Sequence, residues 1–484
     1  MNIIQSLGQS AFRRRCILGT LLLGWLMRLA LILRGGLFYN PDEYRYYRSI
    51  DFLHALVHGA WREALQVFYT YPQHNGSILV GAIPAFFQGL LDKVGLAPAQ
   101  TMHFAAAILA VFPMLNALLG YGIMLRLNRS HAGAFLVLVV LTFSGTMTFY
   151  SRHLLPYYSS LTLALFVIWW MLNGKGGAWR YLIAGACSLG VFLIYNGFWY
   201  LSGALVGILA LIRMPRLPSF FLRATLLAAG YLLGFAAVYG IGRTIDADFF
   251  RGLTYFSQTI SQGDYADGWW IGWVHLFYAE GILLPLFALL ALFSLRANRP
   301  SRLPLACVGL FYLLLLLGSI GLQKFVVYGR SMIPVYTVLV LAGVIGASRF
   351  WRDRPGAYVL LLALVLAQSL ERYVGLFRQT FPSTILTRVQ QTNPDLQLAY
   401  SVLGPQPHVD EAFMDPARFV LLNYRVLTPA TGLASVPSGQ TVDAWPHPAS
   451  HPLYLYNGYT RDERVLLREA DVRIRLIDTG ALPD

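Results

Sequence analysis

Long apolar runs dominate this chain and limit what it can fold into. They recur from about residue 16 to residue 376, and many approach the roughly 20 residues that a helix needs to cross about 30 Å of hydrocarbon. Only 12% of the residues are charged, whereas a soluble domain carries roughly 25%. So few charges cannot cover a water-facing surface. The sequence therefore predicts an all-α polytopic membrane protein and excludes a soluble globular domain.

The apolar runs divide into about eleven predicted membrane spans. Their predicted ranges are 16–34, 101–125, 132–150, 157–172, 180–196, 199–212, 220–241, 272–295, 303–321, 332–348 and 357–376. The basic run Arg13–Arg15 precedes the first span, as in a signal peptide. Arg28 interrupts that span, however, and no clean small-residue cleavage site follows it. We therefore expect the first span to be retained.

Loop charges predict the orientation of the chain. Its formal net charge is +14, and basic residues collect in cytoplasmic loops because they resist translocation. This tendency explains most of the excess, so no nucleic-acid partner is inferred. The basic clusters all fall on one side of the predicted spans: Arg13–Arg15, Arg126 with Arg129, Lys175 with Arg180, Arg213 with Arg216, Arg296 with Arg299 and Arg302, and Arg349 with Arg352 and Arg354. The N-terminus is thus predicted cytoplasmic and the C-terminus extracytoplasmic, with a bacterial inner membrane as the expected location.

Three longer segments are predicted to lie outside the cytoplasm. The first outer loop, 35–100, contains two moderately apolar stretches, of which 77–93 is long enough for an interfacial or re-entrant helix. The second segment, 242–271, is polar and aromatic. The third, 377–484, has soluble composition and is predicted to be a small mixed α/β domain, separate from the membrane module 1–376. Within it, Arg418–Arg425 and Val472–Ile477 have the pattern of short strands.

The stretch Tyr39–Tyr47, which reads YNPDEYRYY, lies just past the outer end of the first predicted span. In the structural interpretation, Pro41 opens a helix and Asp42 and Glu43 occupy its first turn, where carboxylates suit the helix dipole. In the functional interpretation, the carboxylates are held at the membrane surface within reach of a lipid headgroup. A bare Pro-Asp-Glu is a weak motif, and its position after the first span gives it weight.

Three further stretches follow in order on the predicted outer side: Tyr71–Gly76 (YPQHNG), Ser151–Tyr157 (SRHLLPY) and Tyr328–Pro334 (YGRSMIP). With the acidic pair of the first loop, residues 10–376 resemble the GT-C superfamily of glycosyltransferases that use polyprenyl-phosphate sugars. Within it, the chain looks most like the group of the protein O-mannosyltransferases and the lipid A aminoarabinose transferase. The chain departs from the pattern because Ser151–Ser160 contains no carboxylate. The need for a divalent metal ion therefore stays open.

The resemblance implies transfer of a sugar from a polyprenyl-phosphate carrier to a lipid, glycan or protein acceptor. A phosphate is a weakly basic leaving group, so it needs cations and no general acid. One carboxylate, acting as the base for the acceptor, is therefore sufficient. Asp42 is predicted to be this base and Glu43 to assist or orient it. The predicted phosphate-binding residues are Arg330, Arg152, Arg45, Lys324 and His74. The predicted sugar- or acceptor-binding residues are Tyr44, His153, Tyr157, Asp264, Asp267 and Trp269. Each cation also has a structural interpretation, in which it snorkels to the interface or pairs locally.

Two rival functions stay open at this stage. A transporter or lipid flippase predicts intramembrane polar groups and broken helices in two related halves. A polysaccharide polymerase or ligase with a diphosphate-linked donor predicts a large late outer loop that carries the site. The chain lacks a P-loop, an HExxH, a CxxC and a G-x-S-x-G motif, which argues against an ATP-driven pump and a zinc peptidase.

Overall fold

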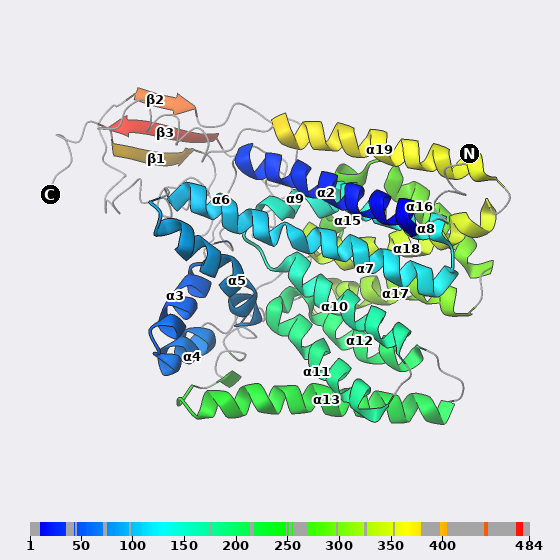
Figure 1. The fold of residues 1–484 in the computed structure, drawn as a ribbon, viewed down its shortest axis with the longest axis horizontal. Coiled ribbons are helices and arrows are strands. Elements are labelled where there is room, and N and C mark those ends of the chain that lie inside the picture. Colours follow the sequence, from blue (N-terminus) through cyan, green and yellow to red (C-terminus); the bar gives the residue numbers. More distant parts are fainter. Residues whose placement is uncertain are drawn as a thin grey trace.

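The computed structural model describes the main body of the chain. The described residues are 10–34, 43, 46–70, 75–95, 98–174, 177–212, 217–247, 249–250, 254, 269–296, 299–323, 327–351, 354–378, 397–403, 440–443 and 471–477. Structural statements below refer to these residues. They form helices except for three short strands near the C-terminus (Figure 1).

Each of the predicted spans coincides with a helix or with two successive helices. The helices are α2 (Ser10–Arg34), α6 (Pro98–Leu109), α7 (Val111–Asn128), α8 (His131–Phe143), α9 (Gly145–Phe149), α10 (Tyr157–Asn173), α11 (Ala178–Ile194), α12 (Trp199–Leu211), α13 (Leu217–Arg243), α15 (Ile271–Glu280), α16 (Leu283–Phe293), α17 (Arg299–Leu316), α18 (Ile333–Phe350) and α19 (Pro355–Arg378). Among the described residues, six helices are long and apolar enough to cross a membrane, or up to eight if each of two bent pairs is one span. The structure thus supports an all-α polytopic fold, while the number of spans stays a prediction.

Helix α18 forms the centre of the bundle and packs against α7, α8, α16 and α17 (Figure 1). Its span window is 94% buried, whereas the window in α13 is only 11% buried. Small residues bring α18 close to α16: a Cβ atom added at Gly346 would lie 1.7 Å from the carbonyl oxygen of Leu290. This close backbone approach is typical of packing between membrane helices.

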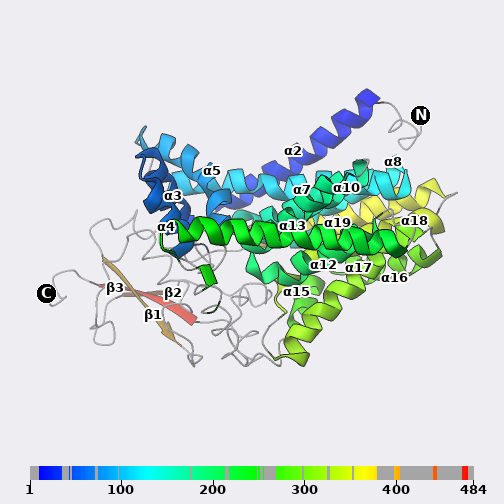
Figure 2. The same ribbon diagram turned by 90° about the horizontal axis from the view of Figure 1, so that it is seen from below.

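Part of the predicted first outer loop folds into three helices at one end of the bundle: α3 (Tyr46–Val57), α4 (Trp61–Thr70) and α5 (Asn75–Asp92). Phe52, Phe68 and Tyr69 form a small core here together with Phe249, which follows α13. Figures 1 and 2 both place these helices at the end of the bundle opposite to the start of α2. The predicted helix at 77–93 matches α5, whereas the structure does not test its re-entrant character.

Three strands, β1 (Gln397–Leu403), β2 (Gln440–Asp443) and β3 (Asp471–Ile477), form one antiparallel sheet in the order β1-β3-β2. The alternating VRIRLI stretch was predicted as a strand and forms most of β3. The second predicted strand, Arg418–Arg425, lies outside the described residues. The mixed α/β domain therefore stays a prediction.

The orientation of the chain is tested by labelling. In a variant without its three cysteines, which are free thiols, a cysteine at Ser438 is expected to react with an impermeant reagent added from outside. A cysteine at Lys175, in a predicted cytoplasmic loop, is expected to react only after the membrane is permeabilised. Labelling of the Ser438 position from the cytoplasmic side alone would contradict the predicted topology.

Candidate functional site

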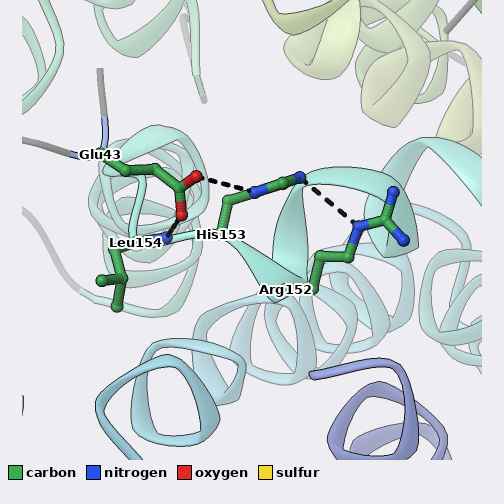
Figure 3. Close-up of polar contacts among 4 residues, drawn as sticks. All are labelled: Glu43, Arg152, His153 and Leu154. Carbon is green, nitrogen blue, oxygen red and sulfur yellow. Dashed lines mark hydrogen bonds and ion pairs between the residues drawn. The ribbon is translucent and has the colours of Figure 1, made fainter. Parts of the chain in front are cut away.

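A buried chain of polar contacts joins Glu43, in the loop after the first predicted span, to the turn before α10 (Figure 3). Glu43 is fully buried. Its Oε1 accepts from the Leu154 backbone N–H at 2.8 Å, and its Oε2 lies 3.1 Å from His153 Nδ1. Arg152 Nε donates to His153 Nε2 at 3.4 Å. Because Nε2 accepts, the ring proton is assigned to Nδ1, where it points at Glu43. Glu43 therefore fixes both the tautomer and the orientation of His153.

The turn that carries Arg152 and His153 results from a break in the predicted span 132–150. Helix α8 ends at Phe143, and Ser144 caps the next helix by accepting from the Met147 backbone N–H. The chain bends by 47° at this cap. The short helix α9 then leads into the 3₁₀ turn η2 (Tyr150–Arg152), after which His153 is extended. Every residue of 144–155 is buried. The break between α8 and α9 therefore places polar side chains in the interior, at one end of the bundle.

Two buried ionisable side chains hold α9 in place. Glu280 of α15 accepts from the Thr146 backbone N–H at 2.6 Å and from the Tyr336 hydroxyl at 2.8 Å. Arg28 of α2 donates to the Met147 carbonyl and to Thr148 Oγ1, both at 3.2 Å. The acidic group meets the N-terminus of α9 and the basic group meets a later carbonyl, as the peptide dipoles favour. These contacts fix the segment that leads into Arg152.

Arg330 lies on the 3₁₀ turn η7 (Gly329–Met332), directly before α18. It is 7% exposed. Its guanidinium carbon lies 4.5 Å from the ring centroid of Tyr328 and 5.8 Å from that of Tyr157. Such distances are favourable for cation–π contact. Arg330 is therefore held by aromatic rings at the same end of the bundle as η2.

An aromatic cluster of Phe149, Tyr150, Tyr157 and His275 connects the two arginines. The Arg152 guanidinium lies 5.5 Å from the Phe149 ring centroid. The Tyr150 ring lies 5.3 Å from Tyr157 and stacks on His275 at 5.7 Å. Arg330 lies over the Tyr157 ring of the same cluster. Residues far apart in sequence thus contact one aromatic cluster.

Glycine is required at position 329 by the close approach of His275. A Cβ atom added there would lie 2.2 Å from His275 Cγ, and the ring cannot withdraw because it is stacked on Tyr150. The glycine of the YGRSMIP stretch therefore lets η7 pack directly on α15. His275 was not predicted as a site residue, because a lone histidine in an apolar run resembles an ordinary core residue.

The structure brings together Glu43, Arg152, His153, Tyr157 and Arg330 from the predicted site. Trp269 is 42% exposed just before α15, and no described contact joins it to the aromatic cluster. The other predicted site residues lie outside the described residues: Asp42, Tyr44, Arg45, His74, Asp264, Asp267 and Lys324. Within the described ranges, no group of three histidine, cysteine or acidic side chains is arranged to hold a metal ion.

Comparisons with known proteins give a structural likeness and no sequence match. No protein-family model matches the chain, and no curated protein sequence matches it. Among solved structures, the oligosaccharyltransferase of Archaeoglobus fulgidus, in a complex with zinc and sulfate, resembles it with a TM-score of 0.43 and 13% sequence identity. The match covers 78% of this chain and 56% of that one. A likeness of this size assigns neither activity nor substrate to the chain.

Proposed function

We propose that this protein is a membrane glycosyltransferase of the GT-C type that transfers a sugar from a polyprenyl-phosphate carrier. The convergence of Arg152 and Arg330 on one aromatic cluster, with Arg152 linked to Glu43 through His153, carries this proposal. Guanidinium groups bind phosphate oxygens in a bidentate manner. Aromatic rings, which are common in ligand pockets, lie next to them, and in this structure these rings are buried.

The reaction proposed for this site is a single displacement. The carboxylate of Asp42 takes the proton of the acceptor hydroxyl or amine, whose lone pair then attacks the anomeric carbon. The bond from that carbon to the phosphate oxygen breaks, and the phosphate leaves with the electron pair. Arg152 and Arg330 stabilise the charge that grows on the phosphate. Glu43 is assigned an orienting role, because both of its oxygens already have partners in His153 and Leu154.

The proposed face of the reaction is extracytoplasmic. Nucleotide sugars are made in the cytoplasm, so a site outside it implies a lipid-linked donor. The acceptor is proposed to be a lipid, glycan or protein of the cell envelope. The cations proposed for the phosphate are the described arginine side chains. Adding a chelator to the transfer assay tests whether a divalent metal ion is also required.

Arg330→Ala tests the phosphate-binding role. In detergent, with a defined polyprenyl-phosphate sugar and a soluble acceptor analogue, the variant is expected to use the donor roughly 10–100-fold less well, because a charge-assisted hydrogen bond contributes about 1.5–3 kcal/mol. The acceptor KM is expected to change little. Arg243→Ala is the matched control, because Arg243 is exposed at the end of α13 on the same predicted face. Equal losses for donor and acceptor would contradict a role at the phosphate.

The second candidate function is transport, and the bent helices favour it. The pairs α8–α9 and α15–α16 bend by 47° and 102°, and Arg28 and Glu280 are buried within span candidates. Transporters use broken helices and intramembrane ionisable groups. Proteoliposomes that contain a lipid-linked sugar distinguish the two functions. Movement of the lipid between leaflets without transfer to an acceptor would favour the transporter.

A further inference from the structure

A cavity of about 340 Å³ lies at the other end of the bundle from the candidate site. It is formed by the end of α10, the start of α11, the residue after α12 and the start of α13. Tyr157, in the aromatic cluster, is the first residue of α10, and Met171, in the cavity wall, is near its last. A helical rise of 1.5 Å per residue separates these positions by roughly 20 Å. The cavity is therefore distinct from the candidate site.

Two arginines line this cavity, and each is held rigidly by a helix end. Arg180 Nη2 donates to the Trp170 carbonyl at 2.6 Å, and the guanidinium lies 4.6 Å from the Trp170 ring centroid. Arg223 Nη1 donates to the Ile212 carbonyl at 2.9 Å and lies over the Tyr181 ring. Both side chains are preorganised with their positive charge at the cavity.

The sequence around the cavity supplies no carboxylate. Residues 93–245 contain ten lysines and arginines and no aspartate or glutamate. None of the residues that line the cavity is acidic. The loops beside it add three more basic residues, Lys175, Arg213 and Arg216. A ligand that complements this region electrostatically is therefore an anion.

The cavity walls also carry apolar groups that continue onto the outer surface of the bundle. Leu222 and Leu226 of α13 line it beside Arg223. Leu222 is 64% exposed and the adjacent Phe221 is 61% exposed. Helix α13 runs along the edge of the bundle (Figures 1 and 2). These exposed apolar side chains on a span candidate suit acyl chains, whereas the arginines suit a phosphate.

We propose that this cavity binds the phosphate of an anionic phospholipid, with the acyl chains lying along α13. Basic pockets between membrane helices bind anionic lipid headgroups on the cytoplasmic side, and loop charges predict that this end is cytoplasmic. The volume is at the low end of the roughly 300–1,000 Å³ found for ligand pockets, which fits a headgroup better than a whole lipid. The lipid site is independent of the proposed transferase activity.

Phospholipid binding to purified protein tests this site. Native mass spectrometry in detergent is expected to show retention of added phosphatidylglycerol and little retention of phosphatidylcholine. The double variant Arg180→Gln with Arg223→Gln is expected to bind phosphatidylglycerol at least roughly tenfold more weakly. Glutamine removes the charge and keeps a polar N–H group on a shorter side chain. Arg126→Gln with Arg349→Gln is the matched control, because these arginines are exposed, predicted on the same side and not in the cavity wall.

A second variant keeps both arginines and covers the case in which the double variant fails to fold. Ser219→Glu places a carboxylate in the cavity wall in the first turn of α13, where the helix dipole favours it. It is expected to displace phosphatidylglycerol by occupying the guanidinium groups. Unchanged retention in both variants would overturn the proposal. Equal retention of phosphatidylcholine would also overturn it. So would competition by millimolar inorganic phosphate without any lipid preference, because free phosphate would then be the occupant.

Discussion

Asp42→Asn is expected to abolish sugar transfer while expression, folding and donor binding stay close to those of the unchanged protein. The substitution preserves size and shape, and asparagine is as good a helix cap as aspartate. It removes the basicity that deprotonates the acceptor. General-base catalysis contributes roughly 10²–10⁴-fold, so the loss is expected in kcat and in kcat/KM alike. The measurement is transfer by purified protein supplied with a polyprenyl-phosphate sugar.

Glu43→Gln provides the matched comparison, because Glu43 is the covalent neighbour of Asp42 and carries the same charge. Its carboxylate orients His153, so its loss disturbs one hydrogen bond and is expected to cost roughly tenfold. Full activity of Asp42→Asn would remove the central residue from the mechanism. A larger loss for Glu43→Gln than for Asp42→Asn would move the base by one position along the chain.

Glu280→Ala is expected to destabilise the protein by about 2–6 kcal/mol, because two buried donors lose their acceptor and each costs about 1–3 kcal/mol. These donors are the Thr146 backbone N–H and the Tyr336 hydroxyl. Glu280→Gln is expected to stay within about 1 kcal/mol, since its carbonyl accepts from Thr146 and its amide donates to the Tyr336 oxygen. The measurement is the midpoint of unfolding in detergent.

Glu371→Ala on α19 serves as the control for charge removal, because its side chain is 64% exposed.

The pair of Glu280 variants also separates the two candidate functions. If Glu280 is structural, Glu280→Gln retains transferase activity. A stable Glu280→Gln variant that has lost translocation would instead indicate a group that carries a proton, as transport requires. Equal stability of the alanine and glutamine variants would contradict the acceptor role.

The sequence predicts where the helices lie, because hydropathy reports the apolar length of a segment directly. It does not predict where a span breaks. The range 132–150 has the composition of one continuous span, and its break at Ser144 depends on a side-chain cap. The range 272–295 breaks at Gly281, which has a φ of +54° that favours glycine. Single serines and glycines are common in straight membrane helices, so neither residue signals a bend by itself.

The candidate site could be predicted in part. The short motifs predicted Glu43, Arg152, His153, Tyr157 and Arg330 as site residues. The structure places both arginines beside one aromatic cluster and Glu43 on His153, and the roles of these residues stay predictions. The bonding partners could not be predicted, because the Glu43–His153 contact joins residues 110 positions apart. The contacts of Glu280 could not be predicted for the same reason, because its partners Thr146 and Tyr336 belong to α9 and α18, which are distant in sequence.

Helix α15 packs on η7, which carries Arg330, and on α9, which leads directly into the turn that carries Arg152. His275 touches Gly329, Phe149 and Tyr150, and Glu280 holds Thr146. The two arginines that are proposed to bind phosphate therefore share one mechanical support. In a double-mutant cycle, Arg152 and Arg330 are then expected to be non-additive by about 0.5–3 kcal/mol. A substitution in α15 is expected to move Arg152 and Arg330 together. Residues of α15, α9 and η7 are therefore expected to change together and not one at a time.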